Sequence, residues 1–161
     1  MNLEGALQIR EMNREDLDAV LEIERESFRT PWSRSLFEKE LIIPFACAFV
    51  AWNLHHFKVV GYLCMWFMGN ETHILNLAVH PNERNKGIGT YLLRYGVEYC
   101  QSRGIQEMTL EVRRSNYQAI SLYRNFQFHP RGIRPRYYQD SGEDAIIMGL
   151  RLDADRVLSL P

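Results

Sequence analysis

The stretch HILNLAVHPNERNKGIGTYLL, residues 73–93, carries the strongest structural signal in the sequence. Its apolar run ends at Val79, and a turn containing a proline leads through Gly87 and Gly89 into residues with helical spacing. The first turn of a helix has amide N–H groups without intrahelical partners, and these carry the positive end of the helix dipole. Glycines let the backbone approach a ligand closely, and two nearby basic side chains add positive charge. The stretch therefore predicts a strand, a turn and a helix whose N-terminus binds a pyrophosphate.

Two other phosphate-binding motifs are excluded here. The stretch lacks the GxxxxGK(S/T) pattern of a P-loop. It also lacks the three-glycine dinucleotide fingerprint, because Leu92 stands where the third glycine would be. On the turn alone, an ordinary strand–turn–helix connection with glycines stays open as an alternative.

Outward from this stretch, the pattern predicts a mixed α/β sheet. Asn13 is expected to cap a helix from Arg14, and Ser33 a second short helix, after a first strand that contains Ile9. Apolar and branched runs predict strands at Phe45–Asn53, Val59–Met68, Thr72–Val79, Met108–Val112, Phe126–His129 and Ala145–Leu152. Helices are expected from Gly87 or Ile88 through Ser102 and over Asn116–Asn125. The middle of the sheet thus carries strand–helix crossovers.

Composition bounds the class of protein. The 161 residues fit one domain with a single core, so we expect one domain over residues 1–161. The net charge of −1 gives no sign of a polyanion-binding protein, and no direct nucleic-acid partner is expected. The longest apolar stretch, Val59–Met68, is shorter than the roughly 20 residues of a membrane helix. The N-terminus has acids early and no apolar segment of a signal peptide, so we expect a soluble cytoplasmic protein without a membrane partner.

No metal site is expected. The three cysteines, Cys47, Cys64 and Cys100, are far apart and form no CxxC or Cys/His spacing, so we interpret them as buried free thiols. The adjacent His55 and His56 have no third candidate ligand nearby, which favours an exposed hairpin loop.

RNKGIG after NLAVHP resembles the R/Q-x-x-G-x-G/A signature of the GCN5-related N-acetyltransferase (GNAT) superfamily. The resemblance implies a mostly antiparallel sheet with a central splayed strand pair. It also implies acetyl-CoA as co-substrate, with its pyrophosphate on the turn and its thioester beside the strand end. The implied cofactor contacts are Leu77, Ala78, Val79, Arg84, Asn85, Lys86, Gly87, Ile88, Gly89 and Thr90.

A second block, LEVRRSNYQAISLYRNFQF at 110–128, resembles the L-E-V-R-x-S-N-x-x-A-x-x-L-Y-x-x-x-G-F block of the RimI type. RimI-type enzymes are bacterial and acetylate the N-terminal alanine of a small-subunit ribosomal protein. ESFRTPWS at 26–33 is similar to that family's substrate-side loop, and RPRYY at 134–138 and EDAIIM at 143–148 are similar to its C-terminal hairpin. The resemblance implies Glu111 as general base, Tyr123 as general acid and a cofactor contact from Asn116.

These residues also have physical interpretations of their own. Glu111 lies between Leu110 and Val112 in a strand, so it points to the opposite face, either into the cleft between the sheet halves or into solvent. Asn116 is a sufficient helix cap without any ligand. Tyr123 is explained equally by a half-buried core position.

One position departs from the family pattern. Gln127 stands where the family has a glycine, whose usual role is the left-handed conformation after a helix. Glutamine in that conformation costs about 1 kcal/mol, or else the turn has a different shape. The departure bears on the placement of Tyr123.

The leading hypothesis is direct acetyl transfer from acetyl-CoA to the N-terminal alanine of a ribosomal protein. No cysteine lies in the two motif blocks, so a covalent acetyl-enzyme is not expected. Within the family, a small-molecule amine or a lysine is the alternative acceptor. A non-catalytic acyl-CoA-binding module is the alternative of another class, and the presence of both Glu111 and Tyr123 argues against it. Trp32, Tyr137 and Tyr138 are candidates for a peptide-binding groove, with ordinary core positions as the alternative.

Overall fold

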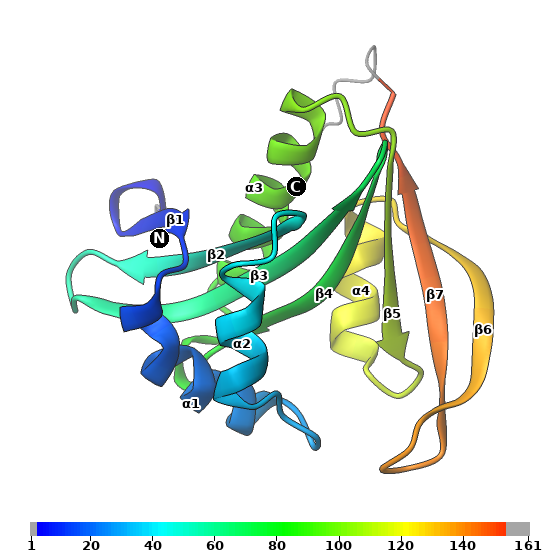
Figure 1. The fold of residues 1–161 in the computed structure, drawn as a ribbon, viewed down its shortest axis with the longest axis horizontal. Coiled ribbons are helices and arrows are strands. Elements are labelled where there is room, and N and C mark those ends of the chain that lie inside the picture. The colour runs from blue at the N-terminus through cyan, green and yellow to red at the C-terminus, as the bar shows by residue number, and fades with distance from the viewer. Residues whose placement is uncertain (1–2, 154–161) are drawn as a thin grey trace.

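The structure is a computed structural model, and it describes residues 3–153. One seven-stranded sheet runs in the order β1-β2-β3-β4-β5-β7-β6 (Figure 1). The strands are β1 (Leu7–Glu11), β2 (Ala46–Asn53), β3 (Lys58–Met68), β4 (Glu71–Val79), β5 (Glu107–Arg113), β6 (His129–Tyr138) and β7 (Glu143–Arg151). The α-helices are α1 (Leu17–Ser27), α2 (Arg34–Glu40), α3 (Ile88–Ser102) and α4 (Tyr117–Asn125), and short 3-10 turns are η1 (Leu3–Gly5), η2 (Arg14–Asp16) and η3 (Pro81–Glu83).

The sheet opens between β4 and β5. These two strands are parallel, whereas the other neighbouring strands pair antiparallel. They pair only from Glu71 to Ile74 on β4 and from Glu107 to Leu110 on β5, and beyond that point they diverge toward their C-terminal ends (Figure 1). The expected mixed sheet, mostly antiparallel with a central splayed pair, is confirmed.

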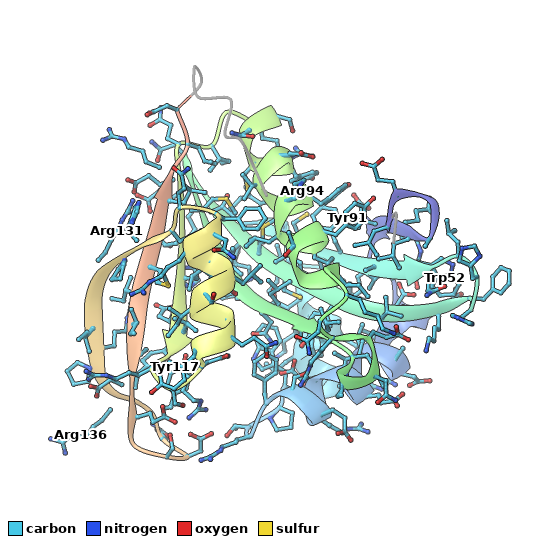
Figure 2. All side chains as sticks on the ribbon, turned by 180° about the vertical axis from the view of Figure 1, so that it is seen from behind. Trp52, Tyr91, Arg94, Tyr117, Arg131 and Arg136 are labelled. Carbon is cyan, nitrogen blue, oxygen red and sulfur yellow. The ribbon has the colours of Figure 1, made fainter. Side chains whose placement is uncertain are left out.

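Helices cover both faces of the sheet. Figures 1 and 2 show α1 and α2 on one face and α3 and α4 on the other. Each face has its own apolar core, because alternate strand residues point to opposite sides. The fully buried Phe37 and Tyr62 belong to the core under α1 and α2, and Leu92, Met108 and Phe128 to the core under α3 and α4.

Local hydrogen bonds fix where the helices begin. The side chain of Asn13 accepts from the Glu15 amide and begins η2, which continues into α1. Ser33 caps α2, and the Asn116 side chain accepts from the Ala119 amide at the start of α4. All three caps are as the sequence predicted, since a side-chain oxygen two or three residues before a free amide is a local feature.

The predicted strand Phe126–His129 is wrong. Phe126 and Phe128 are buried around the end of α4, and the Phe128 amide donates to the Tyr123 carbonyl. Gln127 between them has a φ of 67°, so it takes the left-handed conformation of the family glycine. The strand β6 starts at His129 and runs to Tyr138. Nearly all of its residues are exposed, which is why it lacks the apolar alternation that identifies a strand.

Within residues 3–153, no helix is both long and apolar enough to cross a membrane.

Candidate active site

The turn between β4 and α3 has two left-handed backbone positions. Asn85 has a φ of 60° and Gly87 a φ of 83°, and Gly87 is the N-cap of α3. Glycine takes this conformation without steric cost, and asparagine tolerates it better than most residues. The turn therefore leads directly into the first turn of α3, whose amides have no intrahelical acceptor.

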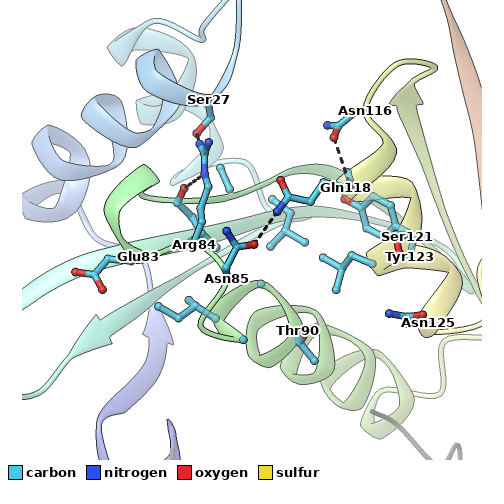
Figure 3. A pocket seen from close by; sticks show the side chains of 18 of the residues that line it. Ser27, Glu83, Arg84, Asn85, Thr90, Asn116, Gln118, Ser121, Tyr123 and Asn125 are labelled. Carbon is cyan, nitrogen blue, oxygen red and sulfur yellow. Dashed lines mark hydrogen bonds between the residues drawn. The ribbon is translucent and has the colours of Figure 1, made fainter. Parts of the chain in front are cut away.

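A cavity of about 520 Å³ lies beside this turn, bounded by the end of β4, the start of α3, the helix α4 and the end of α1 (Figure 3). It is lined by the predicted cofactor residues with one exception: Leu77, Ala78, Val79, Arg84, Asn85, Gly87, Ile88, Gly89, Thr90 and Asn116. The exception is Lys86, whose ammonium lies 2.9 Å from the Glu83 carboxylate. Further lining residues that the sequence did not single out are Ser27, Phe28, Glu83, Gln118, Ala119, Ser121, Leu122 and Asn125. The lining residues on α4 recur at helical spacing on one face of the helix that follows Asn116. This spacing is the sequence signal from which they could have been predicted.

Gly89 keeps the cavity open. A Cβ at this position would lie 3.6 Å from the Leu122 side chain of α4 and 3.8 Å from that of Val79, which are ordinary contact distances. Packing therefore does not require a glycine here. Any larger side chain would occupy the space between α3 and α4, so the cavity is suited to a ligand that reaches the backbone.

The Arg84 side chain is used inside the protein. Its Nε donates to the Val79 carbonyl at 3.0 Å, and its Nη2 donates to Ser27 Oγ at 2.9 Å (Figure 3). These bonds tie the end of α1 to the turn. The guanidinium thus holds the shape of the turn and adds positive charge beside the cavity.

A side-chain hydrogen bond crosses the cavity. The Gln118 amide on α4 donates to Asn85 Oδ1 at 3.1 Å, as Figure 3 shows. It joins the turn after β4 to the helix after β5, the two sides of the opening in the sheet. Both partners are exposed, so the contact is accessible from solvent.

Glu111 lies outside the cavity lining, on the other face of β5. Leu110 and Val112 are buried in the core under α3 and α4, and Glu111 alternates with them as predicted. Its side chain is only 14% exposed, so it does not sit on a solvated face. The His73 Nε2 lies 2.6 Å from one carboxylate oxygen, and the Arg134 guanidinium 3.3 Å from the other.

These contacts lower the pKa of Glu111. The hydrogen bond from His73 is the largest cause, burial opposes it, and the charges of His73 and Arg134 add to it. Sequence reasoning did not single out His73 or Arg134. A polar residue inside the apolar run of β4 was the available signal for His73, whereas Arg134 reaches the site only through the pairing of β6 with β7.

Tyr123 is buried and lines the cavity. Burial is the main cause that raises its pKa above the ordinary phenol value, and the nearby Tyr138 adds to the effect. Burial also raises the pKa of Tyr138, to about 12. Both phenols therefore keep their protons at neutral pH.

The three aromatic candidates for an acceptor groove are in different environments. The Trp32 ring packs 5.2 Å from the Phe37 ring, and its backbone N–H donates to the buried Glu24 at 3.0 Å. Tyr137 is exposed, and Tyr138 is half-buried with the Arg113 guanidinium 4.1 Å from its ring. Trp32 thus belongs partly to the core, while the two tyrosines lie near the end of β6.

Two segments far apart in sequence meet beside these aromatic residues. The Thr30 hydroxyl, between α1 and α2, donates to the Asp140 carboxylate at 3.2 Å. Asp140 lies in the turn between β6 and β7 and also accepts two bonds from Arg113 of β5, each 2.9 Å long. The α1–α2 connection and the β6–β7 hairpin are therefore linked through one carboxylate.

The sequence profile of the acetyltransferase (GNAT) family matches residues 17–128, which include the turn, the cavity, Glu111 and Tyr123. This chain belongs to the GNAT family. Members of this family use acetyl-CoA, and the chain is an acetyl-CoA-dependent N-acetyltransferase. The expectations of a GNAT fold and of this activity are confirmed.

Individual relatives extend the similarity beyond the family profile. A Bacillus subtilis protein, provisionally named a ribosomal protein bS18-alanine N-acetyltransferase, is 39% identical over 146 residues, 90% of this acetyltransferase and 95% of the relative. The Escherichia coli ribosomal protein bS18-alanine N-acetyltransferase is 33% identical over 140 residues, 84% of this chain and 90% of the relative. The crystal structure of the ribosomal-protein-S18-alanine N-acetyltransferase from Escherichia coli superposes with a TM-score of 0.84 at 30% identity, over 94% of this chain and 97% of that one.

Proposed function

We propose that this acetyltransferase modifies the free N-terminal amine of a protein that begins with alanine, with ribosomal protein bS18 as the acceptor. The observation that carries the proposal is the near full-length similarity to the Bacillus subtilis relative, which includes residues 26–33 and 134–138 as well as the cofactor motif. A ribosomal-protein acceptor also places the reaction in the cytoplasm.

We assign acetyl-CoA to the cavity beside α3. Its turn offers backbone amides and the positive end of a helix dipole to a pyrophosphate, and Gly89 leaves the space between α3 and α4 open. Acetyl-CoA supplies the acetyl group as a thioester, which is activated for attack by an amine. Leu77–Val79 line the cavity at the end of β4, beyond the last residue that pairs with β5, so their backbone amides are suited to polarise the thioester carbonyl.

Glu111 is the proposed base. A protein α-amine has a pKa near 7.7–8.0, about 2.5 units below that of lysine, so its neutral form is far more abundant at neutral pH. One carboxylate can then accept the remaining proton, directly or through a water. Glu111 lies on the face opposite to α3 and α4, so the acceptor would approach from the side that carries the α1–α2 connection and the β6–β7 hairpin.

Tyr123 is the proposed acid. Its phenol lines the cavity and holds its proton, because burial raises its pKa. A neutral phenol is suited to donate that proton to the departing thiolate. Asn116 caps α4, and this cap fixes the start of the helix that carries Tyr123.

A competition between two peptides of matched sequence tests the acceptor. One peptide has the bS18 N-terminus with a free alanine amine and a blocked lysine, and the other has an acetylated N-terminus and a free lysine. We expect the first to be acetylated faster by at least tenfold, as judged by mass spectrometry of the products. Faster modification of the lysine peptide would overturn the proposal, as would rapid acetylation of a polyamine with neither peptide modified.

A further inference from the structure

A partly buried chain of hydrogen bonds extends from the proposed base to His73 and Thr109. Glu111 and His73 are adjacent on neighbouring strands, with His73 Nε2 2.6 Å from the carboxylate, and their side chains are 14% and 19% exposed. The other ring nitrogen, Nδ1, lies 2.9 Å from the hydroxyl of Thr109, the residue that pairs with His73 across β4 and β5. Thr109 and Glu111 are two residues apart on β5, so both point to the same face as His73.

The chemistry of these groups fixes the direction of the bonds. An ionised carboxylate only accepts hydrogen bonds, so Nε2 of His73 carries the proton that Glu111 accepts. When the imidazole is neutral, Nδ1 is then an acceptor, and the Thr109 hydroxyl donates a hydrogen bond to it. Both ring nitrogens are engaged, so the ring is held at one orientation toward Glu111.

We propose that His73 is a positioning residue for Glu111, which it holds in one orientation for proton acceptance, with Thr109 fixing the imidazole. The inference rests on the proposed role of Glu111 as base. In this arrangement Glu111 takes one proton from the acceptor amine and keeps its bond to Nε2–H. No proton passes to His73, and the imidazole acts only through the carboxylate.

The location of the chain supports this role. The strands β4 and β5 stop pairing at Ile74 and Leu110, directly after His73 and Thr109. The contact between His73 and Glu111 therefore spans the last paired residues of the two strands. Glu111 is the first residue on its face of β5 beyond that pairing. Without the hydrogen bond from His73, the Glu111 carboxylate would have no contact with β4, because β5 no longer pairs with β4 at this position.

Other charged groups also face Glu111. Arg134 of β6 binds its second oxygen at 3.3 Å, and Tyr138 of the same strand is close enough for the two groups to interact electrostatically. Arg134 is 54% exposed, so its bond is more screened by water than the bond from His73. His73 is accordingly the first cause of the lowered pKa of Glu111.

Two substitutions at one position test the inference. His73→Leu removes the donor, whereas His73→Gln keeps an amide N–H that can donate to the carboxylate. For His73→Leu we expect a kcat lower by roughly 10–100-fold with an unchanged KM for acetyl-CoA, because a misplaced base affects the chemical step. The acidic limb of the pH profile should also move to higher pH, since Glu111 loses the bond that lowers its pKa. His73→Gln should have a kcat and an acidic limb of the pH profile close to those of the parent protein.

A double-mutant cycle separates this inference from the proposed function. If His73 acts through Glu111, His73→Leu combined with Glu111→Gln should be as slow as Glu111→Gln alone, within about twofold. A double variant slower than Glu111→Gln by the full factor seen for His73→Leu alone would overturn the positioning role. A His73→Leu variant with wild-type kcat and pH profile would overturn it as well. Wild-type turnover in Glu111→Gln would instead refute Glu111 as the base. The acetyl-CoA-induced rise in melting temperature, measured for each variant, reports on folding, because neither side chain lines the cavity.

Discussion

Glu24 carries a carboxylate into the core beneath α1, where it is 1% exposed. Its oxygens accept from the Trp32 amide, the Tyr62 hydroxyl and the Asn76 side-chain amide. The carboxylate thus connects the loop between α1 and α2 to β3 and β4. Burial is the main cause that raises its pKa, and the three hydrogen bonds oppose this effect.

The raised pKa of Glu24 predicts a pH dependence of stability. Its pKa in the folded state lies above the ordinary value of 4.5, so between the two values the folded protein binds more protons than the unfolded chain. Its contribution to the free energy of unfolding is therefore largest below 4.5 and falls as the pH rises through the folded pKa. Glu24→Gln removes this titration, although it loses about 1–3 kcal/mol by leaving a buried donor without an acceptor. Urea unfolding of both proteins at several pH values measures this effect. The free energy of unfolding of the parent protein should fall relative to that of the variant as the pH rises. A constant difference would contradict the prediction.

Tyr123→Phe tests a single oxygen in the cavity. The change removes the phenolic hydroxyl and little volume, so the affinity for acetyl-CoA should stay the same. Turnover should fall by roughly 10²–10⁴-fold, the scale of an acid–base group. Binding by calorimetry and steady-state kinetics on the same preparation would separate the two effects. A variant with full turnover would exclude the phenol as the acid.

At the scale of single residues, the sequence predicts what depends on neighbours along the chain. The alternation of Leu110, Glu111 and Val112 was enough to place the carboxylate on the face opposite to the two apolar side chains. The bond from His73 to this carboxylate was not predictable in the same way, because it depends on how far β4 and β5 remain paired. The bond from Arg134 depends on the pairing of β6 with β7.

The helix α3 contains two glycines with opposite surroundings. A Cβ at Gly96 would lie 2.6 Å from the Leu63 side chain, which is fully buried on β3. A Cβ at Gly89 would meet nothing closer than 3.6 Å. Gly96 therefore lets α3 approach the sheet, whereas Gly89 leaves room beside the cavity.

The same substitution at both glycines should have opposite effects. Alanine is favoured over glycine in a helix by about 1 kcal/mol. Gly96→Ala should nevertheless destabilise the protein by about 1–3 kcal/mol, because the added methyl overpacks the core against Leu63. Gly89→Ala serves as the matched control and should leave the unliganded protein at least as stable as the parent. Equal melting temperatures for the two variants would show that the close contact between Gly96 and Leu63 does not require a glycine.

At the scale of elements, the same limit on prediction applies. The caps at Asn13, Ser33 and Asn116 are local, and the predicted helix starts agree with the structure. The strand β6 was misplaced because it lies at the edge of the sheet with nearly all residues exposed, so no apolar alternation marks it. Its pairing with β7 comes from backbone hydrogen bonds that the side-chain pattern does not encode.

At the scale of the whole molecule, the opening between β4 and β5 joins the two sides of the site. The cavity for the cofactor extends from α3 and α4 to the end of α1, and Glu111 lies on the face of β5 away from α3 and α4. Acetyl-CoA would contact the end of β4, the start of α3 and α4 at once, and these are the elements that border the opening. Binding should therefore stabilise the whole fold, by about 2.7 kcal/mol at a hundredfold excess over Kd.

Blocking the cavity should remove this stabilisation by acetyl-CoA. Gly89→Val places two methyl groups in the space between α3 and α4 that the cavity uses, while its Cβ keeps ordinary distances from Leu122 and Val79. The unliganded variant should fold, but the acetyl-CoA-induced rise in melting temperature, roughly 5–10 °C for the parent protein, should disappear. Gly5→Val is the matched control, since a Cβ at Gly5 would have no atom within 4 Å and the residue lies outside the cavity lining. A full thermal shift in Gly89→Val would exclude this turn as the pyrophosphate site, whereas a lost shift in both variants would assign the effect to a general loss of stability.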